Sequence, residues 1–173
     1  FYLLYLCLSF MISCSHPGEY QIFHEYPRQT YNSIIVVGDT QRTSGWEFWR
    51  EQNDEFRKML FPGIVKEKPD AIVILGDLVF SGFSLWHWQE FDQNTHCVRT
   101  SQITIYPLLG NHQYYGNNQK ALQNYFQRFP YLENRRWYDR KLSPAAFLFL
   151  NSNFDELTQE EIFSQNLWYN KKL

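Results

Sequence analysis

The sequence predicts an α/β fold in which strands alternate with helices and pair in parallel. Three apolar runs, at residues 33–37, 71–75 and 103–109, each lead into a glycine followed by an aspartate or an asparagine. The runs are continuous rather than alternating, which is typical of strands buried on both faces. Helical patterns separate the runs, and the order strand–helix–strand favours parallel pairing with right-handed crossovers.

Helices are expected after each of the three strands. The first spans Trp46–Leu60 and should stop at Pro62-Gly63, and the next two span Ser84–Gln93 and Asn118–Phe129. A fourth apolar run, Ala146–Leu150, predicts one more strand.

A last helix is expected near the end of the chain. Thr158 and Glu161 have the spacing of a capping box, in which each side chain bonds the other residue's backbone N–H. The side chains expected to face inward on the first, third and last helices are Trp46, Trp49, Phe56, Met59 and Leu60, then Leu122, Tyr125, Phe126 and Phe129, then Phe163, Leu167 and Leu173.

Size and composition indicate one globular domain. The chain has 173 residues, 44% of them hydrophobic and 20% charged, which excludes a disordered chain. The formal net charge of −2 argues against an electrostatic interaction with nucleic acid, so no nucleic-acid partner is expected. Aromatic residues make up 19% of the chain, and we interpret them as core and helix-face residues.

The N-terminal residues 1–14 are interpreted as an export signal peptide. The run from Phe1 to Ser13 has no charge and is too short for a membrane span. A small residue before Cys14 resembles the lipobox of bacterial lipoprotein signals, which implies a lipid on Cys14, a membrane anchor and a periplasmic or cell-surface location. An ordinary secretory signal with an incidental cysteine is the alternative. Residues 15–31 contain proline, glycine and polar residues and are interpreted as a tether.

The residues that follow the strands have the chemistry of metal ligands. Asp39 and Asp77 supply anionic oxygens, Asn111 an amide oxygen and His112 an imidazole. Gln41 lies close enough to Asp39 either to bind the same metal or to support its ligands. Parallel strands end at one edge of a sheet, so these groups are expected to lie together. Such mixed oxygen and nitrogen ligands suit divalent manganese, iron or zinc.

Three motifs, Gly38-Asp39-x-Gln41, Gly76-Asp77-Leu78-Val79 and Gly110-Asn111-His112, resemble those of the calcineurin-like metallophosphoesterases, which include the purple acid phosphatases. The resemblance implies a β-sandwich flanked by helices, with the site at the carboxyl ends of the strands. It assigns residues 32–173 to the N-terminal part of that domain. It also implies hydrolysis of a phosphate ester by a hydroxide held between two divalent metal ions.

The resemblance also implies a role for each residue. Asp39 would bind the first metal ion, with Gln41 beside it, Asp77 would bridge both ions and Asn111 would bind the second. His112 would be the catalytic residue, facing the substrate and either stabilising the transition state or protonating the leaving oxygen.

Departures from the family pattern leave a second hypothesis open. Glutamine stands at Gln41 where the family usually has histidine, and at Gln113 where an acidic residue is common. No histidine follows His112, whereas the family places further histidine ligands later. We therefore expect a fragment that lacks the C-terminal metal-binding motifs and is itself inactive. The alternative is a surface-anchored binding protein with a degenerate, non-catalytic phosphoesterase fold.

Overall fold

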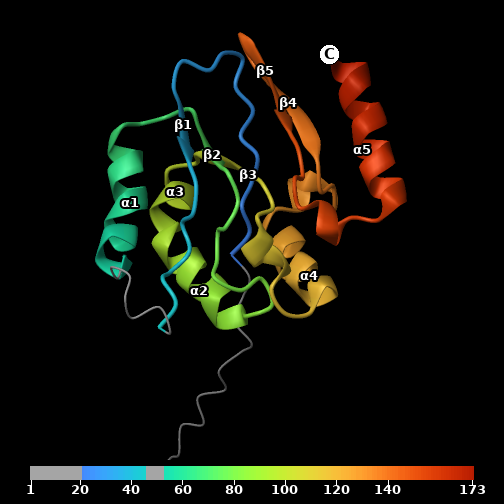
Figure 1. Cartoon of the computed structure of the whole chain (residues 1–173). Helices are drawn as coiled ribbons and strands as arrows, with labels where there is room; N and C mark the ends of the chain where they lie inside the picture. Colours follow the sequence, from blue (N-terminus) through green and yellow to red (C-terminus); the bar gives the residue numbers. More distant parts are fainter. Residues whose placement is uncertain (1–20, 46–52) are drawn as a thin grey trace, which may run out of the picture.

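A three-stranded parallel sheet forms the centre of the computed structural model, which describes residues 21–45 and 53–173. Its strands are β1 (Ile34–Val37), β2 (Ala71–Ile74) and β3 (Thr104–Pro107), in that spatial order (Figure 1). Each residue of β2 is paired on both sides, so that Ala71 lies between Ile34 and Thr104. The predicted parallel α/β class is confirmed.

Burial differs among the three strands. Both β2 and β3 are buried along their whole length, as the continuous apolar runs predict. In β1, however, Val36 is 51% exposed, so burial on both faces was the wrong expectation for this strand. Edge position alone is not the reason, because β3 is also an edge strand. The other edge is covered by residues 21–33, whose Tyr26 and Tyr31 bond Thr104 and Tyr106 of β3.

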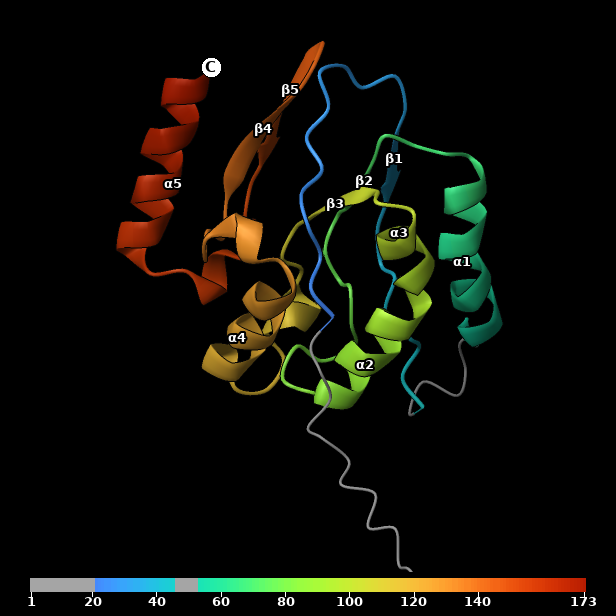
Figure 2. The same ribbon diagram turned by 180° about the vertical axis from the view of Figure 1, so that it is seen from behind.

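Helices α2 (Leu85–Asn94) and α3 (His96–Thr100) lie on one side of the sheet, behind it in Figure 1 and in front of it in Figure 2. Ser84 caps α2, because its hydroxyl accepts a bond from the His87 N–H at 3.4 Å. Phe91 on α2 meets the ring of Phe61 edge-on, with centroids 6.2 Å apart. This contact joins α2 to α1 (Asp54–Lys66).

The buried face of α1 agrees with the prediction only at Leu60, which packs partly buried against the core. Phe56 and Met59 are 71% and 59% exposed, whereas Arg57, Phe61 and Ile64 are buried. Arg57 is buried because its guanidinium has partners. Its Nε donates to the Thr40 carbonyl at 3.0 Å, and Nη1 pairs with carboxylates of Asp54 and Glu90. The predicted Trp46 and Trp49 positions lie outside the described residues.

The C-terminal end of α1 was also placed wrongly. The helix continues through Pro62 and ends at Lys66, rather than stopping at Pro62-Gly63. Proline in a helix interior removes one backbone hydrogen bond, which by itself disfavours the helix. Burial of Phe61 and Ile64 on either side, at 2% and 7% exposure, favours it and outweighs that loss.

Helix α4 (Asn118–Arg128) agrees with the prediction in its bounds and largely in its inward face. Tyr125 and Phe129 are buried, and Leu122 and Phe126 are partly buried against the core. The helix also buries the charged Arg128, which the apolar pattern did not indicate.

A buried ion pair connects α4 to α2. The guanidinium of Arg128 bonds both carboxylate oxygens of Asp92 at 2.8–3.1 Å and lies 4.7 Å from the centre of the Trp88 ring. Burial raises the pKa of the Asp92 carboxyl, and Arg128 opposes that shift. The charge on Asp92 therefore depends on Arg128 remaining in place.

Strands β4 (Tyr138–Leu142) and β5 (Ala145–Phe149) form a separate antiparallel hairpin. The predicted fourth strand corresponds to β5, whereas β4 was missed because its sequence is mostly polar. Residues 21–33 run between β3 and this hairpin in both views of the molecule (Figures 1 and 2).

This segment includes residues that were interpreted as a tether. Phe23 and Tyr31 are buried, and their backbone N–H groups donate to Arg128 and Ser143 carbonyls at 2.8 Å. Residues 21–31 are therefore part of the domain, since they fill the space between the sheet and the hairpin.

The last helix, α5 (Gln159–Lys172), begins with the predicted capping box. Thr158 and Glu161 exchange side-chain bonds to each other's backbone N–H at 2.9 and 3.2 Å. The predicted inward side chains are nevertheless exposed, namely Phe163 at 69%, Leu167 at 48% and Leu173 at 84%.

The buried residue of α5 is Gln165. Its amide accepts from the Asn151 N–H and donates to the Asn151 carbonyl, at 2.8 and 3.0 Å. A polar contact therefore sets the rotation of this helix.

Two short 3₁₀ turns connect elements in the C-terminal part of the chain. They are Pro130–Leu132, before β4, and Phe154–Glu156, between β5 and α5.

No helix in residues 21–45 and 53–173 is long and apolar enough to cross a membrane. The predicted signal peptide and Cys14 lie outside the described residues.

We predict that Arg128→Met lowers the free energy of unfolding by about 3–5 kcal/mol, because it removes the ion-pair partner of the buried Asp92 carboxylate. Urea denaturation measures the change. Adding Asp92→Leu to that variant should restore much of the stability, since the buried carboxylate is then removed together with its partner. Arg135→Met is the control, because Arg135 is 59% exposed and should contribute under about 1 kcal/mol. Equal effects of the two arginine substitutions would contradict this account.

Candidate functional site

The ends of β2 and β3 approach so closely that only glycine fits at two positions. A Cβ on Gly76 would lie 2.8 Å from the Gly110 Cα, and a Cβ on Gly110 would lie 2.1 Å from Asp77 Oδ1. Gly76 also has a φ of +97°, a left-handed conformation that side chains disfavour. The glycines of the second and third motifs therefore bring the Asp77 carboxylate against the loop that contains Asn111 and His112.

A buried glutamine links these two strand ends. The side-chain oxygen of Gln113 accepts bonds from the backbone N–H groups of Asp77 and Gly110, at 2.8 and 2.9 Å. Its amide nitrogen contacts the Val79 carbonyl at 3.5 Å. Gln113 is fully buried, so these bonds do not compete with solvent. The glutamine at this position, where the family commonly has an acidic residue, thus contacts the backbone of Asp77, Val79 and Gly110.

His112 is held by its backbone and by its ring. Its N–H donates to Asp77 Oδ1 at 3.0 Å, and its carbonyl accepts from the Gly82 N–H at 2.9 Å. The ring Nδ1 lies 2.6 Å from the Phe80 carbonyl oxygen. Because a carbonyl oxygen only accepts, Nδ1 carries the proton in this bond and Nε2 is left available for a ligand.

The loop after β1 is fixed between β2 and α1. Gln41 N–H donates to the Asp77 carbonyl at 3.0 Å, and Asn53 Nδ2 donates to the Gln41 carbonyl at 3.1 Å. Asp39 has a φ of +52° and Asp77 a φ of +51°. Both aspartates thus leave their strands through the same left-handed turn, which aspartate tolerates better than most residues.

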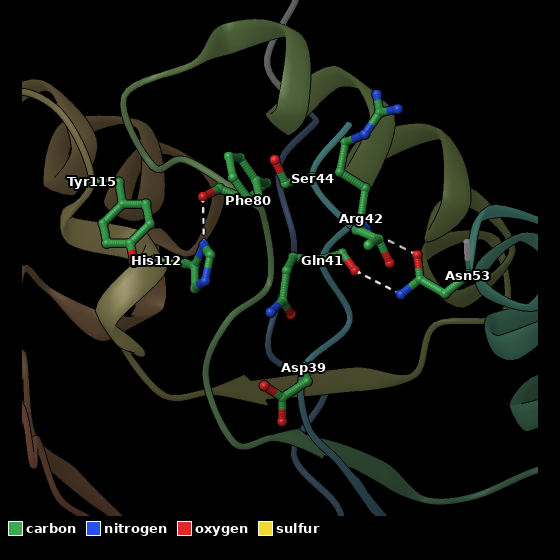
Figure 3. Close-up of a pocket in the computed structure, with 9 residues that line it drawn as sticks. Asp39, Gln41, Arg42, Ser44, Asn53, Phe80, His112 and Tyr115 are labelled. Carbon is green, nitrogen blue, oxygen red and sulfur yellow. Dashed lines mark hydrogen bonds between the residues drawn. The ribbon is translucent and has the colours of Figure 1, made fainter. Parts of the chain in front are cut away.

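A pocket of about 410 Å³ opens at this edge of the sheet. It is lined by Asp39, Gln41 and His112 among the predicted site residues (Figure 3). Asp77 and Asn111 are not among its lining residues. They adjoin it through contacts, because Asp77 bonds the His112 backbone and Asn111 Nδ2 lies 3.4 Å from the Tyr115 hydroxyl.

Six further residues line the pocket that sequence reasoning had not assigned to the site. Phe80 and Tyr115 follow the second and third motifs closely, so their proximity to those motifs was an available signal. Asn53 is distant in sequence and gave none. The complete lining is Asp39, Gln41, Arg42, Thr43, Ser44, Asn53, Phe80, His112 and Tyr115.

The donor atoms fit a divalent cation in two respects. The Gln41 side-chain oxygen is buried and has no hydrogen-bond partner among the described residues, an arrangement that costs free energy unless a donor or cation approaches it. The Asn111 amide nitrogen is directed to Tyr115, which leaves the Asn111 oxygen as its free ligand atom. Within residues 21–45 and 53–173, no group of three or more His, Cys, Asp and Glu side chains gathers as a metal site, so the set depends on amide oxygens.

We predict that Gln113→Leu destabilises the domain by about 2–5 kcal/mol, because it leaves two buried backbone N–H groups without acceptors. Thermal and urea unfolding measure the change. Gln123→Leu, at an exposed position of α4, should shift stability by less than about 0.5 kcal/mol. A Gln113→Leu domain as stable as the Gln123→Leu control would refute the linking role of Gln113.

Comparison with known proteins agrees with the motif assignment. A sequence profile described as calcineurin-like phosphoesterase matches residues 33–171. No curated protein sequence matches the chain. The matched range includes the three glycine motifs, the sheet and the helices around it. The chain therefore belongs to the calcineurin-like phosphoesterase family.

Proposed function

We propose that this protein hydrolyses phosphate esters with the help of two divalent metal ions bound at the carboxyl ends of β1, β2 and β3. Family membership supports metal-dependent phosphoester hydrolysis in general terms. The observation that carries the specific proposal is the shared pocket, in which Asp39, the unpartnered Gln41 oxygen and His112 meet.

Asp39, Gln41, Asp77 and Asn111 are the residues that would hold the ions. When bound, such ions supply positive charge at the phosphoryl oxygens and lower the pKa of a coordinated water. We expect manganese, iron or zinc, because mixed oxygen and nitrogen donors suit these divalent ions. Asp77 is suited to a central position, because it stands between the Gln41 backbone and the His112 backbone.

His112 is proposed to protonate the leaving oxygen. Its Nδ1–H is engaged by the Phe80 carbonyl, so the ring orientation is set before substrate binds. The protonated imidazole donates from Nε2 to the ester oxygen as the P–O bond breaks, and water supplies the new oxygen on phosphorus. The products are an alcohol and phosphate, and His112 is left neutral until it takes up a proton again.

A non-catalytic binding protein is the second candidate function. The absence of a His, Cys, Asp and Glu cluster from the described part of the chain favours it, as does glutamine at positions 41 and 113. Such a protein would bind a phosphate ester in the same pocket without turnover. Metal content together with activity separates the two proposals.

Attachment of the protein to a membrane through a lipid on Cys14 is proposed from the sequence alone. Its consequence would be export to the periplasm or the cell surface. Mass spectrometry of the mature N-terminus is the test, and an unmodified first residue other than Cys14 would rule the lipid anchor out.

We predict that Asp77→Asn removes both metal and activity. The full-length protein should contain close to two transition-metal ions per chain by mass spectrometry and should hydrolyse p-nitrophenyl phosphate. Asp77→Asn should lower the metal content and reduce kcat/KM by at least about 100-fold, the lower end of what one electrostatic group contributes to such chemistry. Asp155→Asn, an exposed carboxylate, is the matched control and should retain both.

Two outcomes would decide against this proposal. Full activity of Asp77→Asn would remove Asp77 from the site. Metal binding without turnover, in a wild-type protein tested on several phosphate esters, would favour the binding protein. His112→Asn separates chemistry from metal binding, because it should keep the metal and lose about 10²–10⁴ in kcat.

A further inference from the structure

The pocket has two chemically different sides. Figure 3 shows the rings of Phe80 and Tyr115 beside His112, whereas Arg42 and Asn53 lie on the opposite side. The Tyr115 ring centre is 4.4 Å from the His112 ring centre, and Phe80 lies 5.1 Å from His112. An aromatic wall therefore stands next to the group that we propose to act on the leaving oxygen.

Tyr115 is held by hydrogen bonds although it is partly exposed to solvent. Its carbonyl accepts bonds from the Phe83 N–H and the Ser81 hydroxyl, at 3.3 and 3.2 Å, and its N–H donates to His112 at 3.3 Å. The phenol oxygen lies 3.4 Å from Asn111 Nδ2. The residue is nevertheless 45% exposed. An aromatic ring that is held and partly exposed can stack with a ligand at little cost in conformational entropy.

Distances restrict the kind of ligand that can use this ring. A leaving oxygen protonated by His112 must lie about 3 Å from Nε2. Stacked rings have centres about 4.5–7 Å apart. Tyr115 is close enough to His112 that both conditions suit a ring joined to the ester oxygen directly or through one carbon. A nucleoside places a sugar between the phosphate and the base, so its ring lies farther from the ester oxygen than a ring joined directly or through one carbon.

We propose that Tyr115 is a substrate-binding residue and that the substrate class is phosphate esters with an aromatic ring on, or one carbon from, the leaving oxygen. This inference rests on the proposed function, because it uses the position assigned to the leaving group beside His112. The opposite side, lined by Arg42 and Asn53, is polar and is left for the polar parts of the substrate.

Binding of two non-hydrolysable probes tests the proposal on full-length protein loaded with metal. Phenylphosphonate and cyclohexylphosphonate have the same charge and nearly the same size, but only the first has an aromatic ring. Isothermal titration calorimetry should show phenylphosphonate binding about twofold to tenfold more tightly, the range expected for one aromatic pair. Tyr115→Leu should bring this ratio close to one.

Two further variants keep the test decisive. Tyr115→Phe retains the ring and should retain the ratio, even if Tyr115→Leu folds poorly. Tyr169→Leu, on α5, is the matched tyrosine control and should leave the ratio unchanged. A ratio near one in the wild type, or an unchanged ratio in folded Tyr115→Leu, overturns the proposal, as does failure to bind either probe.

Turnover adds a readout that is independent of leaving-group reactivity. Benzyl and cyclohexylmethyl phosphate are both esters of primary alcohols, so a preference for the benzyl ester in KM reports on ring binding. Tyr115→Leu should remove this preference with a smaller effect on kcat. If the wild-type protein turns over neither ester but still binds phenylphosphonate more tightly than cyclohexylphosphonate, hydrolysis is refuted and Tyr115 remains a ligand-binding residue. Turnover of both esters with equal KM would refute the role of Tyr115 alone.

Discussion

The close approach of the β2 and β3 ends is the constraint on which the rest of the site depends. Gly76 and Gly110 allow the two backbones to approach so closely that a Cβ on either would collide with its neighbours. Gln113 then satisfies the N–H groups that this approach buries. As a result, Asp77 and His112, which are distant in sequence, share a direct hydrogen bond.

The side-chain amides of Gln41 and Gln113 have functions in this site that depend on their being neutral or on their N–H donors. Gln113 accepts two backbone bonds and offers a donor to the Val79 carbonyl, whereas a carboxylate only accepts. A buried carboxylate would also add a second negative charge beside Asp77. Gln41 presents a buried oxygen without adding charge to the pocket that already contains Asp39. The site thus gathers oxygen donors with a small number of negative charges.

Polar residues decide the orientation of several helices in the domain. Arg57 occupies the buried face of α1, Arg128 that of α4 and Gln165 that of α5. Each is buried because specific partners satisfy its hydrogen-bonding groups, as with the contact between Gln165 and Asn151. A prediction from apolar spacing alone therefore assigns the wrong buried face to most of α1 and to α5. It places Phe163 inward, where the structure exposes it.

The sequence by itself determined the parallel α/β class, the positions of β2, β3, α2 and α4, and the capping box of α5. These are local properties, since apolar runs, helix periodicity and cap spacing act within a few residues of each other. The three glycine motifs also pointed to one sheet edge, where Asp39, Gln41 and His112 line a pocket that Asp77 and Asn111 only adjoin. Only the tertiary structure decided that Asn53 and Tyr115 complete the pocket, that residues 21–31 belong to the domain, and that β4 pairs with β5. Those features depend on contacts between distant segments, where a polar group is buried or exposed according to the partner that it meets.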